Sequence, residues 1–295
     1  MNQEVKTVEE LEAIANRLRI KIVQMIAYSG VGHAGGAMSI TEMVTVLYFR
    51  EMLIDKNDPD FPNRDRLILS KGHAVPALYA VFSELGYISE DLLYTLHKID
   101  SPLQMHPEYG VCPGIEMSTG ALGQGLSASV GMAIGAKIRK KPFRIYAILG
   151  DGELAEGQVW EAAMAASKYN LDNLVALIDY NKLALTDKTD VVMPLEPLVA
   201  KWRSFGWEVF EINGHSIKEL IDVFDKAGSV KGKPVAIICH TEKGHKIPYY
   251  AGKPSCHSVS FTEDQLIETL ESLNCEKDEI EKTLMCVREK NKCRK

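Results

Sequence analysis

The sequence predicts an α/β fold, a doubly wound parallel sheet with helices on both faces. Five short apolar runs are typical of strands buried on both sides, and helix-like segments lie between several of them. Strands that alternate with helices in this way form a parallel sheet with helices packed on it. The runs are RLILS (66–70), FRIYAILG (143–150), NLVALID (173–179), WEVFEI (207–212) and PVAIICH (234–240).

The chain opens with an amphipathic helix. Apolar side chains recur at helical spacing from Leu11 to Ile26, which predicts a helix over residues 7–28 that ends before the glycine-rich stretch SGVGHAGGAMS. We expect a second helix from about Thr41. Residues 100–125 are rich in Pro, Gly and Ser and predict a long loop, which in a compact domain is usually functional.

Size and charge limit the classes of function. The 295 residues are 46% hydrophobic and 25% charged, enough for one large domain or two small ones. We expect a domain over residues 1–260 and a charged, helical C-terminal tail over residues 261–295. The formal net charge is −6 and the pI is near 5.8, so neither nucleic acid nor an anionic membrane surface is favoured as a partner.

Sequence features at the N-terminus and at the cysteines indicate a cytoplasmic protein. The first residues lack the apolar core of a signal peptide, and no stretch approaches about eighteen uninterrupted apolar residues. The cysteines stand far apart without a Cys-x-x-Cys pair, which favours reduced thiols over a disulfide framework or a zinc site. They are Cys112, Cys239, Cys256, Cys275, Cys286 and Cys293.

Two polar residues follow consecutive predicted strands. Asp151 stands after the run that ends at Gly150, and Asn181 stands thirty residues later, just past the next run. Because the carboxyl ends of parallel strands share one edge, the two side chains can converge there as hard oxygen ligands for Mg²⁺ or Ca²⁺. Gly150 and Gly152 would allow close approach of the backbone, and a helix that starts near Glu153 would favour an anion. An isolated Gly-Asp-Gly is usually a turn, so the prediction of a metal site depends on the pairing of Asp151 with Asn181.

Several blocks in the right order resemble one enzyme family. The Gly-Asp-Gly at 150–152 followed by Asn181 is similar to the thiamine diphosphate motif, and the surrounding sequence resembles the N-terminal third to half of transketolase. The resemblance runs from about Ala13 to His257 through NRDRLILSKGHAVPALYAVFSELGY, MHPEYGVCPGIEMSTGALGQGLSASVGMA and GDGELAEGQVWEAA. It implies a thiamine diphosphate-binding fold.

The resemblance assigns expected roles at the cofactor. Asp151, Asn181 and the backbone carbonyl of Leu183 would hold the Mg²⁺ or Ca²⁺ ion that bridges the diphosphate. Lys71 and Lys243 match lysines near the diphosphate, where a point charge suits phosphate oxygens. The cofactor-binding positions that the resemblance implies are Lys71, His73, Gly120, Leu122, Gly150, Asp151, Gly152, Glu156, Asn181, Lys243 and His257.

Other matched positions concern catalysis and the subunit interface. Gly120 and Leu122 match the loop whose backbone meets the aminopyrimidine, and Glu156 matches an acid that helps to join two cofactor sites across an interface. A ring of histidines would surround the reactive thiazolium carbon and the sugar hydroxyls, and histidine suits this work because its ordinary pKa is about 6.5. The matching histidines are His33, His73, His106 and His257.

The resemblance also implies a reaction and a partner. Transketolases transfer a two-carbon ketol unit from a ketose to an aldose in carbohydrate metabolism, such as the pentose phosphate route. Whole transketolases continue into a pyrimidine-binding domain, and no segment after Phe261 resembles it. We therefore expect the N-terminal subunit of a split transketolase that acts on sugars or sugar phosphates. Its expected partner is a separate C-terminal subunit, in a heterotetramer with two copies of each chain.

Two alternatives remain open from the sequence. The alpha subunit of a thiamine-dependent 2-oxoacid dehydrogenase shares the Gly-Asp-Gly and the asparagine, although the histidine blocks argue against it. A non-catalytic module that only holds thiamine diphosphate is the second alternative. The presence of the four matching histidines disfavours that interpretation.

Overall fold

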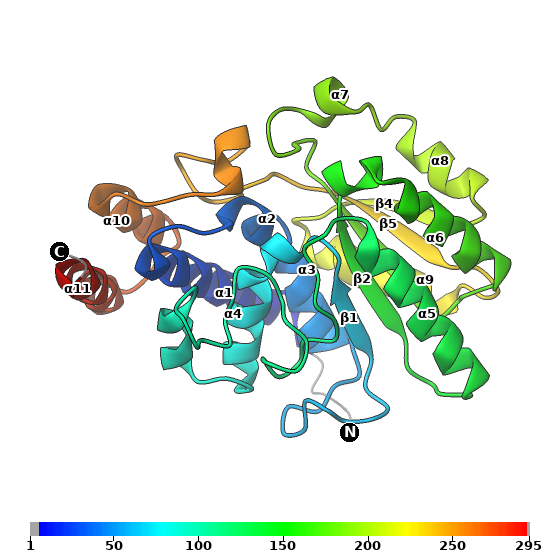
Figure 1. The fold of residues 1–295 in the computed structure, drawn as a ribbon, viewed down its shortest axis with the longest axis horizontal. Helices are drawn as coiled ribbons and strands as arrows, with labels where there is room; N and C mark the ends of the chain where they lie inside the picture. The colour runs from blue at the N-terminus through cyan, green and yellow to red at the C-terminus, as the bar shows by residue number, and fades with distance from the viewer. Residues whose placement is uncertain (1–5, 294–295) are drawn as a thin grey trace.

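A five-stranded sheet forms the centre of the protein, with its strands in the order β1-β2-β3-β5-β4 (Figure 1). All four neighbouring pairs are parallel, so the predicted parallel sheet is confirmed. The computed structural model describes residues 6–293. The strands are β1 (Arg66–Leu69), β2 (Ile145–Gly150), β3 (Leu174–Tyr180), β4 (Glu208–Asn213) and β5 (Val235–His240).

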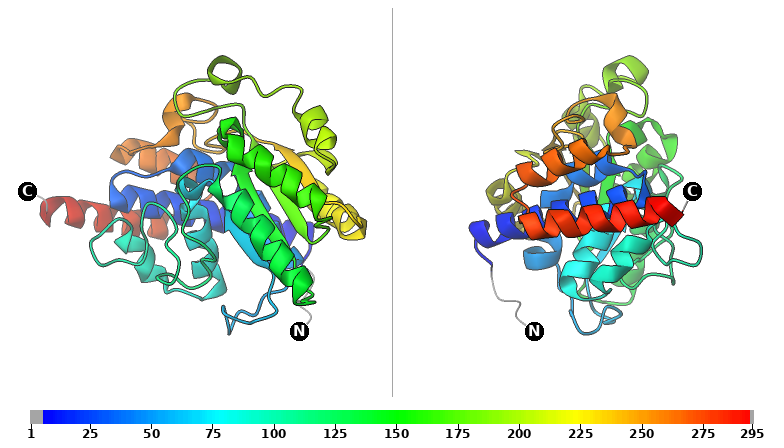
Figure 2. Two further views of the ribbon diagram at one scale, coloured as in Figure 1. Left: turned by 45° about the vertical axis from the view of Figure 1, so that its right-hand side comes forward. Right: turned by 90° about the vertical axis from the view of Figure 1, so that its left-hand side faces the viewer.

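Helices cover both faces of the sheet, as the sequence predicts (Figures 1 and 2). They are α1 (Val8–Ser29), α2 (Ala34–Ser39), α3 (Thr41–Val46), α4 (Pro76–Leu85), α5 (Gln124–Ile138), α6 (Gly157–Lys168), α7 (Thr189–Val192), α8 (Leu198–Ser204), α9 (Ile217–Ser229), α10 (Glu263–Ser272) and α11 (Lys277–Cys293). Successive strand residues point to opposite faces. On β2, Tyr146 and Ile148 join the core on the α1 side, whereas Ala147 and Leu149 join the core beneath α5 and α6.

Capping residues define the ends of α1. The Thr7 hydroxyl accepts the Glu10 N–H at 3.2 Å, and the Glu10 carboxylate accepts the Thr7 N–H at 2.7 Å, which forms a capping box. Gly30 ends the helix with a φ of 90°, a left-handed conformation that favours glycine. The helix therefore begins at Val8, just inside its cap, and ends close to the position that periodicity predicts.

The glycine-rich stretch after α1 contains α2, a short helix that the sequence pattern did not predict. All six of its residues are buried. A Cβ on Gly35 would lie 2.5 Å from the Cys256 carbonyl oxygen, and one on Gly36 would lie 3.1 Å from His73 Nε2. Gly35 therefore lets α2 pack closely against the loop that carries Cys256, and Gly36 lets it pack closely against the His73 ring.

The two C-terminal helices pack against α1. The Asn16 side-chain amide donates to the Leu273 carbonyl at 2.6 Å, and Gln24 Nε2 donates to Thr283 Oγ1 at 3.0 Å. Leu270 belongs to the same buried cluster as the apolar side of α1. In the right-hand view of Figure 2, α10 and α11 lie in front of the N-terminal helices. Residues from the predicted tail thus contribute to the main core.

The cysteines that the structure describes are free thiols. Cys112, Cys239, Cys256 and Cys275 are buried, and Cys286 is partly buried. The Cys293 side chain lies outside the described part of the chain. Across residues 6–293, no helix combines the length and the apolar character that a membrane crossing needs.

Candidate active site

A cavity of about 490 Å³ lies at the carboxyl edge of the sheet. Every site residue predicted from the sequence lines it except Glu156, whose exposed side chain lies at the start of α6, outside the lining. The predicted residues in the lining are His33, Lys71, His73, His106, Gly120, Leu122, Gly150, Asp151, Gly152, Asn181, Leu183, Lys243 and His257. Segments from both halves of the chain therefore meet at one site.

Asp151 and Asn181 reach this cavity from neighbouring strands. β2 and β3 pair with Gly150 opposite Asp179, so the residues that follow the two strands share one edge. The Asp151 N–H donates to the Asp179 carbonyl at 3.3 Å, which connects the end of β2 to the end of β3. The structure thus brings the two side chains into one cavity, as their spacing predicts.

The Asp151 carboxylate lies buried at the end of β2. It is 2% exposed and accepts two backbone N–H groups. Burial and the neighbouring Asp179 carboxylate raise the pKa of Asp151 to about 7, because both disfavour the ionised form. A divalent cation bound there would favour the ionised form of Asp151, because it would stabilise the negative charge of the carboxylate. Asn181 Nδ2 donates to Asp179 Oδ2 at 2.9 Å, which fixes the amide so that its oxygen accepts the Leu183 N–H at 3.1 Å.

A buried ion pair supports the floor of the cavity. The Lys71 ammonium pairs with Asp179 and donates to the Gly36 carbonyl at 3.0 Å, and both charged side chains are almost fully buried. Asp179 also accepts hydrogen bonds from the hydroxyls of Ser39, at 2.6 Å, and of Thr241. Burial alone would raise the pKa of Asp179, but Lys71 and the hydroxyl donors hold it below its ordinary value. Lys71 is therefore oriented by an anion of the protein itself.

Lys243 also lines the cavity and is bound to backbone carbonyls. Its ammonium donates to the carbonyls of Leu183, at 3.1 Å, and Ala184, at 2.8 Å, and the residue is 4% exposed. Burial lowers the pKa of Lys243. The Leu183 carbonyl, predicted as a metal ligand, is thus occupied by a cation in this structure.

The four predicted histidines form a cluster around His33. Its ring centroid lies 5.6 Å from that of His73, 6.0 Å from that of His106 and 5.2 Å from that of His257. Burial lowers the pKa of His33 and of His257 to about 4, and it also lowers the pKa of the other two rings. The rings are therefore uncharged near neutral pH. His257 Nδ1 is buried, and no described residue provides it with a hydrogen bond.

Glu153 lines the cavity and joins three segments of the site. Its buried carboxylate accepts the Ser70 hydroxyl, the Gly123 N–H at 2.8 Å and the Gly150 N–H at 3.1 Å. Where the sequence predicts a helix that starts near Glu153, the structure has a 3₁₀ helix over Gly152–Ala155, followed by α6 from Gly157.

Glycine is required in the loop that faces the histidines. Gly120 has a φ of 147°, a conformation that L side chains rarely adopt. A Cβ there would also lie 2.9 Å from a ring carbon of His106. The backbone of this loop can therefore lie directly against the ring.

The sequence analysis missed two buried acids, Asp179 and Glu153, and several lining residues. A signal for Asp179 was present, because an ionisable residue inside a run buried on both faces must have a partner. Glu153 carried no such signal, since an acid after a turn is usually exposed. Besides Glu153, the lining residues that the sequence analysis missed are Gly36, Ala184, Leu185, Thr186 and Val192.

Comparisons with known proteins agree with this geometry. Residues 11–287 match the family model described as "Transketolase, thiamine diphosphate binding domain". The chain is 45% identical over 255 residues to a 6-deoxy-6-sulfo-D-fructose transketolase subunit, SqwG, of Clostridium sp. (strain MSTE9), with 86% of this chain and 93% of that protein aligned. It is 40% identical to one of the apulose-4-phosphate transketolase subunits of Phocaeicola vulgatus, over 93% of this chain and 98% of that one.

Solved structures extend the likeness to the fold. The transketolase of Campylobacter jejuni superposes with a TM-score of 0.87 at 28% identity, over 92% of this chain. The aligned region is 44% of that transketolase chain, so the present chain spans less than half of its length.

Proposed function

Because the chain belongs to the transketolase family, we propose that it is the cofactor-binding subunit of a two-subunit transketolase. This enzyme transfers a two-carbon ketol unit from a ketose to an aldose. One observation carries the proposal: Asp151 and Asn181, at the ends of adjacent parallel strands, share a cavity with a cluster of uncharged histidines. An oxygen-ligand site beside proton-transfer groups is what this chemistry requires.

The residues present fit a metal-bridged diphosphate. Asp151 offers a desolvated carboxylate, and the Asn181 amide oxygen and the Leu183 carbonyl supply further hard oxygens for Mg²⁺ or Ca²⁺. A dication at that carbonyl would replace the Lys243 ammonium and free it to bind phosphate oxygens. Lys71, held by Asp179, adds a second fixed positive charge on the same cavity.

Thiamine diphosphate, when bound, supplies the chemistry that breaks and forms a carbon–carbon bond beside a carbonyl. The protein's own part is to bind, orient and move protons. His33, His73, His106 and His257 are neutral near pH 7 because burial lowers the pKa of each ring, so each can accept a proton from a sugar hydroxyl. His257 Nδ1 is buried without a hydrogen-bond partner among the described residues, so a polar group of a bound ligand would satisfy it.

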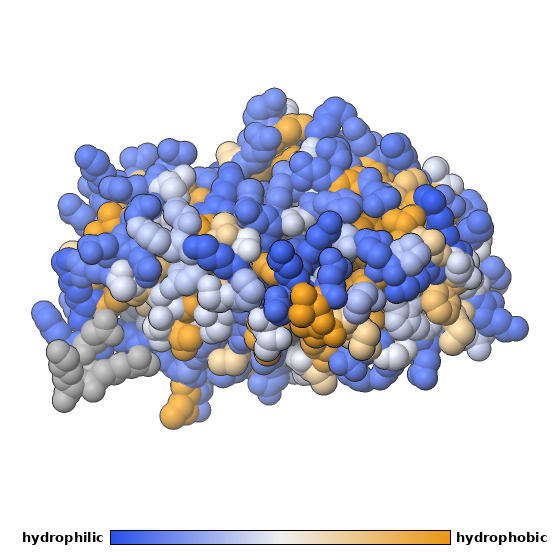
Figure 3. Space-filling model, turned by 90° about the horizontal axis from the view of Figure 1, so that it is seen from above, coloured by the Kyte–Doolittle hydropathy of each residue, from blue (hydrophilic) through white to orange (hydrophobic). Residues whose placement is uncertain are grey.

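A second subunit completes the enzyme in this proposal. The two relatives compared in sequence are named as transketolase subunits, and this chain aligns with nearly all of each. The segment 185–193, near the mouth of the cavity, exposes Leu185, Val191, Val192 and Met193, and the face seen from above carries several apolar patches (Figure 3). We assign this face to a C-terminal subunit, in a heterotetramer with two copies of each chain, with Glu156 near the interface.

The finer assignments follow from the same reasoning. The substrates are sugars or sugar phosphates, as in carbohydrate metabolism such as the pentose phosphate route, and the location is the cytoplasm. The sulfosugar and phosphosugar in the relatives' names belong to those proteins.

The test is a donor comparison in the presence of a C-terminal transketolase subunit, Mg²⁺ and thiamine diphosphate. Ketose donors should support two-carbon transfer to an aldose acceptor, and a 2-oxoacid should not be decarboxylated at a comparable rate. Turnover of the 2-oxoacid but not of the ketose donors would refute the transketolase assignment in favour of a 2-oxoacid dehydrogenase. Cofactor binding without turnover of either donor would favour a binding module.

A further inference from the structure

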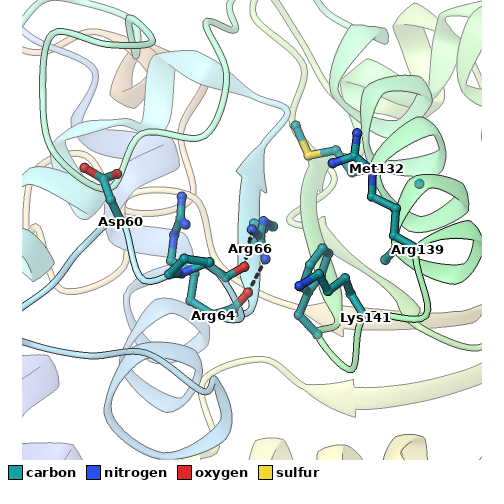
Figure 4. Close-up of a pocket in the computed structure, with 10 residues that line it drawn as sticks. Asp60, Arg64, Arg66, Met132, Arg139 and Lys141 are labelled. Carbon is teal, nitrogen blue, oxygen red and sulfur yellow. Dashed lines mark hydrogen bonds between the residues drawn. The ribbon is translucent and has the colours of Figure 1, made fainter.

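A second cavity, of about 630 Å³, lies at the opposite edge of the sheet (Figure 4). Arg66 begins β1, and Phe143 lies just before β2, so both stand at the amino ends of the strands. Lys141 lies in the turn between α5 and β2. A strand of six residues, β2, separates this cavity from the candidate active site, which corresponds to roughly 20 Å. The two cavities are therefore distinct.

The lining of this cavity carries a surplus of positive charge. Arg64 is neutralised by Glu116 through two hydrogen bonds of 3.0 Å. In contrast, within residues 6–293 no carboxylate lies within 4.0 Å of the charged groups of Arg66, Arg139 or Lys141. This surplus stands out in a chain whose net charge is −6.

Arg66 is held in place by a ring contact and by backbone carbonyls, and it forms no ion pair with the described residues. Its guanidinium stacks 3.6 Å from the centroid of the Phe143 ring and donates to the Pro62 carbonyl at 3.0 Å and to the Arg64 carbonyl. A guanidinium has five N–H donors, so donors remain for a ligand. Burial and the neighbouring Arg64 charge lower the pKa of Arg66, and the Glu116 and Asp65 carboxylates only partly oppose this effect.

The uncharged residues of the lining are Pro62, Met132, Gly135, Ala136 and Phe143, so the rest of this cavity is largely apolar. Figure 4 shows Asp60 and Arg64 on one side of the cavity and Met132, Arg139 and Lys141 on the other, with Arg66 between them. Space also remains over α5, since a Cβ built on Gly135 meets no other atom within 4 Å. A ligand that combines an anionic group with an apolar or planar part fits both features.

We propose that this cavity binds a small organic phosphate. Arg66, Arg139 and Lys141 hold the phosphate, because two guanidinium groups and an ammonium suit a dianion better than a single carboxylate. The organic part lies against Met132 and Phe143. This site is separate from the thiamine diphosphate site, and its assignment does not depend on the proposed reaction.

Calorimetric titration with phenyl phosphate tests this proposal on the full chain. Saturating thiamine diphosphate and Mg²⁺ keep the probe out of the other cavity. We expect one saturable site that binds phenyl phosphate more tightly than inorganic phosphate. The double variant Arg139→Gln/Lys141→Gln should weaken binding at least about fivefold, since it removes two charge-assisted contacts. Lys140→Gln is the matched control, because Lys140 lies in the same turn but not in the lining.

Three results would overturn the proposal. The first is an absence of saturable binding by the wild-type chain, and the second is equal weakening in Lys140→Gln and in the double variant. The third is equal affinity for inorganic phosphate and phenyl phosphate, which would remove the role of Met132 and Phe143. If thiamine diphosphate itself fails to bind, the proposed function fails, while the comparison between the variants still tests this cavity.

Discussion

Replacement of Asp179 by asparagine should lower the free energy of unfolding by about 3–5 kcal/mol. Asp179 is fully buried, and its carboxylate pairs with the Lys71 ammonium, which is 2% exposed. Asparagine keeps the size of the side chain and can still accept hydrogen bonds, but it cannot neutralise a charge. The variant therefore isolates the charge of Asp179 from its shape.

The magnitude follows from what remains after the substitution. Breaking a buried ion pair by removing one partner costs about 3–5 kcal/mol, because the other charge stays in a poorly solvated place.

Urea unfolding at pH 7 measures the effect. The matched control is Asp222→Asn, which removes the partner of Lys218 in a pair whose side chains are 68% and 44% exposed. That control should change the free energy of unfolding by less than about 0.5 kcal/mol. A loss below about 1 kcal/mol in Asp179→Asn would show that the Lys71 charge is compensated by other groups and would refute this reasoning.

Three further predictions concern the histidines and the partner. His33→Ala and His106→Ala should each lower kcat/KM for the ketose donor by roughly 10- to 100-fold, with cofactor affinity nearly unchanged. The control is His240→Ala, at an exposed histidine. A collapse of cofactor affinity in the two site variants would show that the rings are structural supports. Burial lowers the pKa of His33 and His257 from 6.5 to about 4, so the unfolded chain binds more protons and stability falls as the pH drops through this window. Urea unfolding at pH 7 and pH 5 should show a smaller loss in His33→Gln/His257→Gln than in the wild type, and an equal loss would contradict the assignment. Finally, the purified chain should not catalyse ketol transfer until a C-terminal subunit is added, and turnover by the chain alone would contradict the two-subunit proposal.

Much of the fold follows from local pattern. The apolar runs that form β2 and β3 are almost wholly buried, so their composition alone marks them as central strands. The position of Asp151 and Asn181 then follows from a general property of parallel sheets. These features need no knowledge of which segments pack together.

Other features depend on contacts between distant segments and could not be predicted. Nothing local marks α2, since its glycines are needed for packing against distant residues, Gly35 against Cys256 and Gly36 against His73. The C-terminal helices are rich in charge, yet a few apolar residues such as Leu270 complete the core beside α1. The surplus charge around Arg66 arises because strand β1 and the turn after α5 meet in space.

The central claim is that the carboxyl-edge cavity binds thiamine diphosphate through a divalent metal held by Asp151 and Asn181. Calorimetric titration of thiamine diphosphate, with the partner subunit present and with or without Mg²⁺, tests it most directly. We predict that wild-type binding requires the metal. Asp151→Ala and Asn181→Ala should each lower the affinity at least about 100-fold, while the control Asp222→Ala leaves it unchanged. Equal affinity for thiamine diphosphate in the wild type and both site variants would contradict the account.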